Sequence, residues 1–157
     1  MSAPVQALLA RINQPILTGM LSLWEEKRGS RDWPLRRDFD PFEFRFALGF
    51  VSLVEVHAPP RRFFYRLDGT KQAELFGADC TGKYLDQAAC RAASDLTAQD
   101  FCDALVNGRP HYHERDLDWN GGRLRYSGIV LPLSREGRRV DMLMTVVVPG
   151  RLDPSAA

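Results

Sequence analysis

Several features that mark large functional classes are missing from this sequence of 157 residues. Lysine and arginine number 21 and aspartate and glutamate 20, so no excess charge favours nucleic acid or an anionic membrane. No segment approaches the roughly 20 apolar residues that a membrane-spanning helix needs. The opening Met-Ser-Ala-Pro lacks the basic and apolar regions of a signal peptide. We therefore expect a cytoplasmic protein that binds neither nucleic acid nor membrane.

Cysteine is scarce, and the familiar catalytic motifs are absent. Three cysteines at irregular spacings do not build a disulfide framework, so we expect reduced thiols. Neither the phosphate-binding Gly-x-x-x-x-Gly-Lys, the nucleophile motif Gly-x-Ser-x-Gly nor the zinc motif His-Glu-x-x-His occurs. The hydrophobic fraction of 45% and the charged fraction of 26% are ordinary globular values, and the length suits one domain.

The first third of the chain, residues 1–49, predicts a helical cap. A short helix precedes Pro15, which starts a longer helix that ends near Gly29. Asp40 and Pro41 predict the N-cap and first residue of another helix. Four residues of the long helix recur at helical spacing and form one apolar stripe: Leu17, Met20, Leu21 and Trp24. The stripe has two interpretations, because it can pack on its own sheet or form a homodimer contact across a two-fold axis.

The segment from residue 63 to residue 82 carries the most informative pattern. Aromatic residues from Phe63 onward predict a strand, and Asp68-Gly69 predicts a tight turn that uses a positive φ. Thr70 is then expected to N-cap a short helix, which Gly77 terminates in a left-handed conformation.

The remaining segments complete an α+β pattern. Strands are predicted over residues 50–56, 62–67, 111–119, 123–133 and 140–148, and a helix over 94–106 with Leu96, Phe101, Leu105 and Val106 on one side. Asn120-Gly121-Gly122 predicts a hairpin turn. Because the late strands are apolar on both sides, we expect cover on both faces of the sheet. Residues 50–149 form the predicted core and 150–157 a tail, in one domain overall.

This order of elements resembles a known family. An Arg-bearing strand, Gly69-Thr70, a single helix and the run from Phe76 to Gly82 are similar to the centre of a PAS domain, above all the small single-domain PAS proteins of proteobacteria. Trp24 in the first long helix and the later Asp40-Pro41 match the start of those proteins. The resemblance implies a bacterial, non-catalytic sensor of signal transduction, with a five-stranded antiparallel sheet in the order 2-1-5-4-3. It also implies protein partners, a small-molecule ligand and a homodimer.

Candidate ligand-binding residues follow from the pattern and the resemblance. Arg66 lies in an otherwise aromatic and aliphatic strand, where it either anchors an anionic ligand or pairs with an acid such as Asp68 or Asp79. Cys80 occupies the place of the reactive cysteine of flavin-binding PAS domains, but the late strands lack the Asn and Gln that such domains use. We therefore expect no flavin and a buried cysteine. The candidate set is Arg66, Thr70, Phe76, Cys80, Tyr126, Ser127, Met142 and Met144.

His111 and His113 share one face of a predicted strand, because side chains alternate with period two. Two imidazoles at that spacing can begin a metal site, but Arg115 follows on the same face and no third ligand is evident nearby. The helix over residues 94–106 contains no histidine for a haem iron. We therefore expect neither metal nor cofactor.

An enzyme is the alternative from a different class. A small α+β enzyme with a cone-shaped sheet, of the isomerase or dehydratase type, needs a buried acid or histidine as general base. Most acids here lie in predicted turns or on the polar face of the third strand, which favours a binding module. The feature that separates the two alternatives is an acid that points inward.

Overall fold

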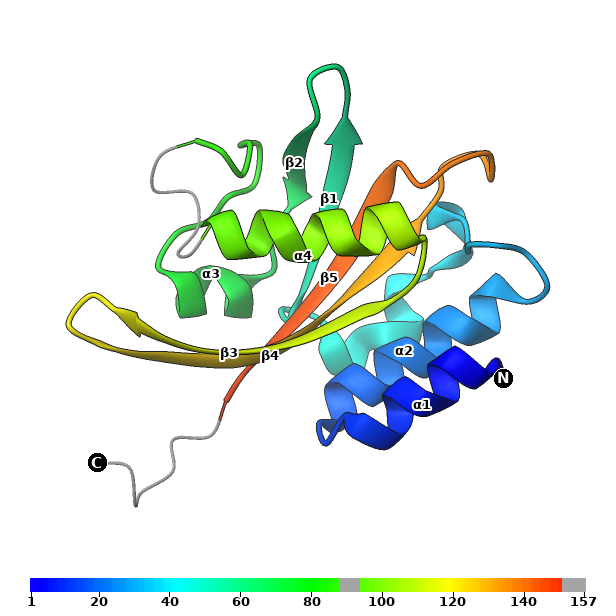
Figure 1. The fold of residues 1–157 in the computed structure, drawn as a ribbon, viewed down its shortest axis with the longest axis horizontal. Helices are drawn as coiled ribbons and strands as arrows, with labels where there is room; N and C mark the ends of the chain where they lie inside the picture. The colour runs from blue at the N-terminus through cyan, green and yellow to red at the C-terminus, as the bar shows by residue number, and fades with distance from the viewer. Residues whose placement is uncertain (88–93, 151–157) are drawn as a thin grey trace.

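An antiparallel sheet of five strands forms the centre of the computed structural model, which describes residues 1–87 and 94–150. The strands are β1 (Val51–His57), β2 (Arg62–Leu67), β3 (His111–Trp119), β4 (Gly122–Leu133) and β5 (Met142–Pro149). Their order, β2-β1-β5-β4-β3, confirms the expected α+β fold and its topology. Figure 1 shows the twisted sheet with helices on both faces.

The N-terminal segment folds into helices that cover one face of the sheet. It comprises α1 (Ala3–Arg11), α2 (Pro15–Arg28) and the 3-10 helices η1 (Arg36–Asp38) and η2 (Pro41–Ala47). As predicted, α2 begins at Pro15 and ends before Gly29, which has a φ of 59°. Asp40 caps η2, since its side chain accepts a hydrogen bond from the Phe42 amide.

The face under these helices is almost entirely apolar. Alternate residues of β4 and β5 pack against the stripe of α2. The indole Nε1 of Trp24 donates to the Pro132 carbonyl at 2.9 Å, which fixes α2 on β4. The sheet side of this core comprises Val51, Leu53, Ile129, Leu131, Leu133, Met142, Met144, Val146 and Val148.

The opposite face is covered by α3 (Thr70–Phe76) and α4 (Ser94–Asn107). Phe101 of α4 meets Phe63 of β2 edge-to-face, with ring centroids 5.2 Å apart. The buried residues of α4 are Asp100, Phe101 and Ala104. Val106, predicted on the apolar side of this helix, is instead 72% exposed, because the buried stripe runs through Asp100.

The turn before α3 differs from the prediction. Gly69 has a φ of −64° and serves as the N-cap itself, so Thr70 is the first helical residue. A glycine is required there for space, since a Cβ would lie 2.4 Å from the Gly49 carbonyl oxygen and 2.6 Å from that of Val51. Gly77 ends α3 with a φ of 82°, as predicted.

A buried carboxylate and a disulfide stabilise the loop that follows α3. Asp68, 5% exposed, accepts hydrogen bonds from the Ser52 hydroxyl at 2.7 Å and the Cys80 amide at 3.0 Å. Cys80 is fully buried and disulfide-bonded, so the prediction of reduced thiols is wrong for this residue, whereas Cys102 is free. Spacing along the chain carries no information on which sulfur atoms meet in space. The predicted tail lies, from residue 151 on, outside the described residues.

Candidate functional site

A small cavity lies between the sheet and helices α3 and α4. Its volume is about 10 Å³, which gives room for about one water molecule. The Gln72 amide closes one side, because its Nε2 donates to the Phe50 and Thr145 carbonyls at 2.8 and 3.0 Å. The polar residues that line the cavity are Tyr65, Gln72, Thr97, Asp100, His113, Tyr126 and Thr145.

Asp100 is the acid that points inward. It is 2% exposed, on the same side of α4 as Phe101 and Ala104, and Thr97 one turn earlier also lines the cavity. The helical period places residues 97, 100, 101 and 104 on one face, so an acid enters the core with the apolar residues. A buried carboxylate without partners is strongly unfavourable, and the neighbouring strand supplies them.

The partners of Asp100 come from alternate positions of β3. His111 Nε2 lies 3.0 Å from Asp100 Oδ1, and Arg115 Nη2 donates to the same oxygen at 2.5 Å. His113 Nδ1 is 3.7 Å from Asp100 Oδ2, which is too long for a hydrogen bond. The sequence did not indicate Asp100 as a neighbour of the two histidines, because it lies on a separate helix and is brought to them only by tertiary packing.

His113 is held by packing on every side. It is 8% exposed, its ring stacks at 5.9 Å from that of His111, and it meets Tyr126 edge-to-face at 6.0 Å. Its strand partner is Gly128, where a Cβ would lie only 2.5 Å from His113 Nε2. Burial lowers the pKa of His113 to about 4, although the Asp100 carboxylate acts in the opposite direction. The imidazole is therefore neutral near pH 7.

Two buried nitrogen atoms beside Asp100 have no hydrogen-bond partner among the described residues. They are His113 Nδ1 and Arg115 Nε. Most buried polar atoms in folded proteins are paired, so two such atoms around one carboxylate mark a site that can accept a further polar or ionic group. Chemically, the cluster offers a carboxylate and two imidazoles.

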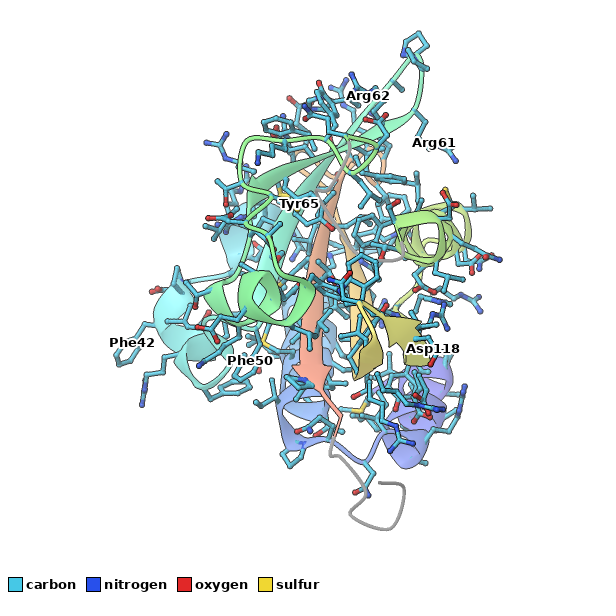
Figure 2. All side chains as sticks on the ribbon, turned by 90° about the vertical axis from the view of Figure 1, so that its left-hand side faces the viewer. Phe42, Phe50, Arg61, Arg62, Tyr65 and Asp118 are labelled. Atoms are coloured by element: carbon cyan, nitrogen blue, oxygen red, sulfur yellow. The ribbon has the colours of Figure 1, made fainter. Side chains whose placement is uncertain are left out.

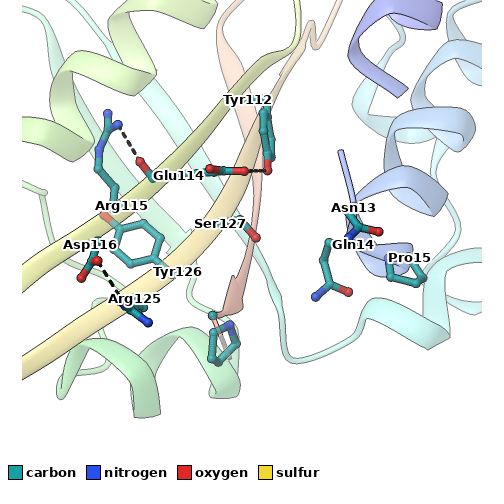
Figure 3. A pocket seen from close by; sticks show the side chains of 12 residues that line it. Asn13, Gln14, Pro15, Tyr112, Glu114, Arg115, Asp116, Arg125, Tyr126 and Ser127 are labelled. Carbon is teal, nitrogen blue, oxygen red and sulfur yellow. Dashed lines mark hydrogen bonds and ion pairs between the residues drawn. The ribbon is translucent and has the colours of Figure 1, made fainter. Parts of the chain in front are cut away.

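An open cleft with a volume of about 880 Å³ also borders β3 and β4. Figure 3 shows it between the α1–α2 connection and the strands, with Ser127 at its centre. Two pairs of its polar side chains contact each other: Tyr112 donates to Glu114 at 2.5 Å, and Arg125 lies 3.1 Å from Asp116. Burial, together with the Glu114 carboxylate, raises the pKa of Tyr112 to about 12.

The structure separates the candidate ligand residues. Phe76 and Tyr126 line the inner cavity, and Tyr126 and Ser127 line the open cleft. Arg66 and Thr70 are exposed and line neither, so a ligand contact by either stays a prediction. Cys80 is buried outside the cavity lining.

Two further groups of candidate residues lie in the buried core. Met142 and Met144 belong to the apolar core under α2, on the face away from the cavity. The stripe expected to form a dimer contact is at most 2% exposed and packs on the chain's own sheet: Leu17, Met20, Leu21 and Trp24. It therefore forms the core, as the other interpretation expected.

Comparison with known proteins finds one family model and similar solved structures. A family model for the PAS domain matches residues 12–101, which is more than half of the chain. The PAS domain of Bordetella pertussis BvgS is similar at 12% identity and a TM-score of 0.42, with 74% of this chain and 91% of that chain covered. The periplasmic sensory domain of the Campylobacter jejuni chemoreceptor Tlp1 is similar at 13% identity and a TM-score of 0.41, with 91% of this chain and 57% of that chain covered. No curated protein matches the sequence. Because the family model spans more than half of its length, the chain belongs to the PAS domain family.

Proposed function

We propose that this PAS sensory domain is a non-catalytic module that binds a small ligand beside α4 and signals through a protein partner. The observation that carries the proposal is the cluster of Asp100, His111 and His113, which joins α4 to the edge strand β3. A ligand that changes these contacts changes the balance between arrangements of α4 on the sheet. The two nitrogen atoms that have no hydrogen-bond partner within residues 1–87 and 94–150 support this proposal, because a ligand that pairs with them would favour one arrangement over the other.

The enzyme alternative receives one supporting observation and one opposing observation. Asp100 and His113 are a buried acid and a buried neutral histidine, as a general base requires. The cavity they face, however, has a volume of about 10 Å³. A substrate of even a few heavy atoms needs far more, since small-molecule pockets are typically about 300–1,000 Å³. This difference favours a sensor over an isomerase or dehydratase.

The surface for a partner, including a second copy in the expected homodimer, has to lie outside the α2 stripe. Exposed apolar side chains gather in and after η2, where Phe42 is 68%, Phe46 48% and Leu48 51% exposed. Figure 2 shows Phe42 projecting from the edge of the molecule. Aromatic side chains are enriched at protein interfaces, so the proposed contact surface for a partner is this segment.

The expected cytoplasmic location receives little support from the structure. None of the helices in residues 1–87 and 94–150 has the length and apolar character to cross a membrane. The disulfide at Cys80 favours an oxidising compartment. The proposed function applies to either cellular compartment.

Native mass spectrometry of freshly purified protein tests the proposal, combined with hydrogen exchange of α4. We expect a retained small molecule or ion whose removal raises amide exchange in α4, because the cluster ties this helix to β3. Arg66→Met tests the exposed arginine separately, since loss of the ligand in this variant would assign Arg66 to the site. Exchange of α4 that does not respond to any bound species would contradict the sensory role.

A further inference from the structure

The ligand class of this site follows from its donor atoms. Asp100, His111 and His113 each offer one metal-ligand atom, and these atoms lie within 4.8 Å of one another. We propose that the three residues bind a single divalent transition-metal ion of the zinc class. The inference rests on the proposed function, because it names the ligand of the same site.

The chemistry of the donors selects the metal. Two imidazole nitrogens and one carboxylate oxygen suit Zn²⁺ and its first-row neighbours, which bind His and Asp at about 2.0–2.2 Å. Calcium and magnesium need mainly oxygen ligands and are disfavoured. Three protein ligands leave one position open, as in zinc sites that accept a fourth ligand. Asp103, three residues after Asp100 on α4, has its Oδ2 4.0 Å from His111 Nε2.

The geometry requires only local adjustment. Ligands around a tetrahedral zinc ion are about 3.3 Å apart when the bonds are about 2.0 Å long. The two separations here run to different oxygens of the Asp100 carboxylate: His111 Nε2 lies 3.0 Å from Oδ1, and His113 Nδ1 lies 3.7 Å from Oδ2. The three ligand atoms, one from each residue, all lie within 4.8 Å of one another. The side chain of His111 is 27% exposed and borders solvent, so its ring can move. Asp100 and His113 stay fixed by their burial.

The second observation that points to a ligand is the orphaned nitrogen of His113. This side chain is more than nine-tenths buried, and its Nδ1 has no partner among the described residues although it faces Asp100. In the tautomer that leaves Nδ1 unprotonated, its lone pair can bind a metal ion directly. Gly128 contributes to positioning, because any larger residue at this place would displace the His113 ring.

Arg115 occupies the cation's place in this structure. Its guanidinium bonds Asp100 Oδ1 at 2.5 Å, and a metal ion on the same carboxylate has to displace this positive charge. The Arg115 side chain is 24% exposed, so it can turn outward into solvent. Metal and arginine therefore compete for one carboxylate, and the competition gives the site a two-state character.

Zinc binding to the tag-free protein, first stripped with a chelator, tests the inference. Equilibrium dialysis against Zn²⁺ alone should give one ion per chain, and Co²⁺ should give a visible absorption band of a low-symmetry site. His111→Gln should weaken binding at least tenfold and keep the fold, since His111 is partly exposed. His57→Gln is the matched control, because His57 is the remaining histidine of the chain and lies on β1.

The Arg115→Leu variant distinguishes a metal site from an ion pair that is only structural, through its effect on zinc affinity. Removal of the competing charge should tighten zinc binding at least threefold, whereas loss of Asp100 in Asp100→Asn should abolish it. Equal affinities in the wild type, His111→Gln and Asp100→Asn would overturn the inference, and so would weaker zinc binding in Arg115→Leu. Circular dichroism of each variant verifies that the fold is intact.

The same experiments separate this inference from the proposed function. An organic molecule retained in native mass spectra, with no zinc bound at the cluster, overturns the metal site and leaves the sensory proposal standing. One zinc ion per chain that leaves the hydrogen exchange of α4 unchanged supports the metal site and contradicts the sensory role.

Discussion

The two faces of the sheet are built from the same strands but on different principles. The face under α1 and α2 is packed by aliphatic side chains from alternate positions of β4 and β5. The face under α3 and α4 buries polar groups among aromatic rings, including Gln72, Asp100, His113 and Thr145. Helices pack on both faces, so the difference lies in the chemistry of the buried side chains.

The buried polar side chains on the face under α3 and α4 are not needed for the stability of the fold. Buried polar residues seldom stabilise a core more than apolar residues of the same volume. The apolar core under α1 and α2 therefore stabilises the fold, whereas the face under α3 and α4 carries the polar groups of the proposed ligand site. The predictions below challenge that division, beginning with the largest effect.

Trp24 tests the apolar face. Trp24→Ala should lower the free energy of unfolding by about 3–5 kcal/mol, because the side chain is 2% exposed and leaves a large cavity. Trp24→Phe keeps a ring but loses the hydrogen bond to Pro132, and should cost about 1–2 kcal/mol. Urea unfolding measures both. A folded, monomeric Trp24→Ala with unchanged stability would show that the α2 stripe is not core.

Glu25 is a buried acid of α2, and its contribution to the free energy of unfolding depends on pH. It accepts hydrogen bonds from Arg28 at 2.8 Å and from the Ser2 amide at 2.9 Å. The hydrogen bond from Arg28, the largest cause, lowers the pKa of Glu25 from 4.5 to about 2, against the effect of burial. The folded-state pKa is thus below the unfolded value, so the contribution is complete above pH 4.5 and is lost as the pH falls toward 2.

The expected size of this contribution is about 1–2 kcal/mol, since the Arg28 side chain is 22% exposed and partly screened. Urea midpoints of the wild type and Glu25→Gln should differ at neutral pH and converge as the pH falls below 4.5. A difference that stays constant down to about pH 3 would show that the ion pair contributes nothing that protonation can remove.

The sequence predicted most of the architecture, because local signals specified it. Pro15, Gly29 and Gly77 mark helix ends through backbone preferences that act within a few residues, and the structure confirms each of them. The alternation of apolar residues in β4 and β5 likewise predicted a sheet covered on both faces. Such signals need no knowledge of the distant parts of the chain.

The candidate site was largely missed, because it depends on contacts between distant segments. The sequence showed two histidines on one face of β3. The carboxylate that contacts them belongs to Asp100 of α4, a helix whose buried side was predicted from its apolar residues alone. The useful signal was the helical spacing that puts Asp100 beside Phe101 and four residues before Ala104. Arg66 was favoured because its neighbours are aromatic, yet it lies exposed on the edge strand β2.

A pair of glycines, one on each face, gives the smallest and sharpest test. At Gly128 an alanine Cβ would meet His113 Nε2 at 2.5 Å and Cε1 at 2.9 Å. His113 is buried and its ring cannot retreat, so Gly128→Ala should cost about 1–3 kcal/mol. It should also weaken zinc binding, since the displaced ring carries a ligand atom.

Gly19 on α2 is the matched position. An alanine Cβ there would lie 2.9 Å from the Phe46 ring, but Phe46 is 48% exposed and can swing into solvent. Alanine also favours a helix over glycine by about 0.5–1 kcal/mol. Gly19→Ala should therefore change the midpoint of thermal unfolding little, or raise it. If both variants were equally destabilised, close contact alone would account for the two faces. If Gly128→Ala alone is destabilised, the fixed His113 ring is the cause, as a preformed ligand site requires.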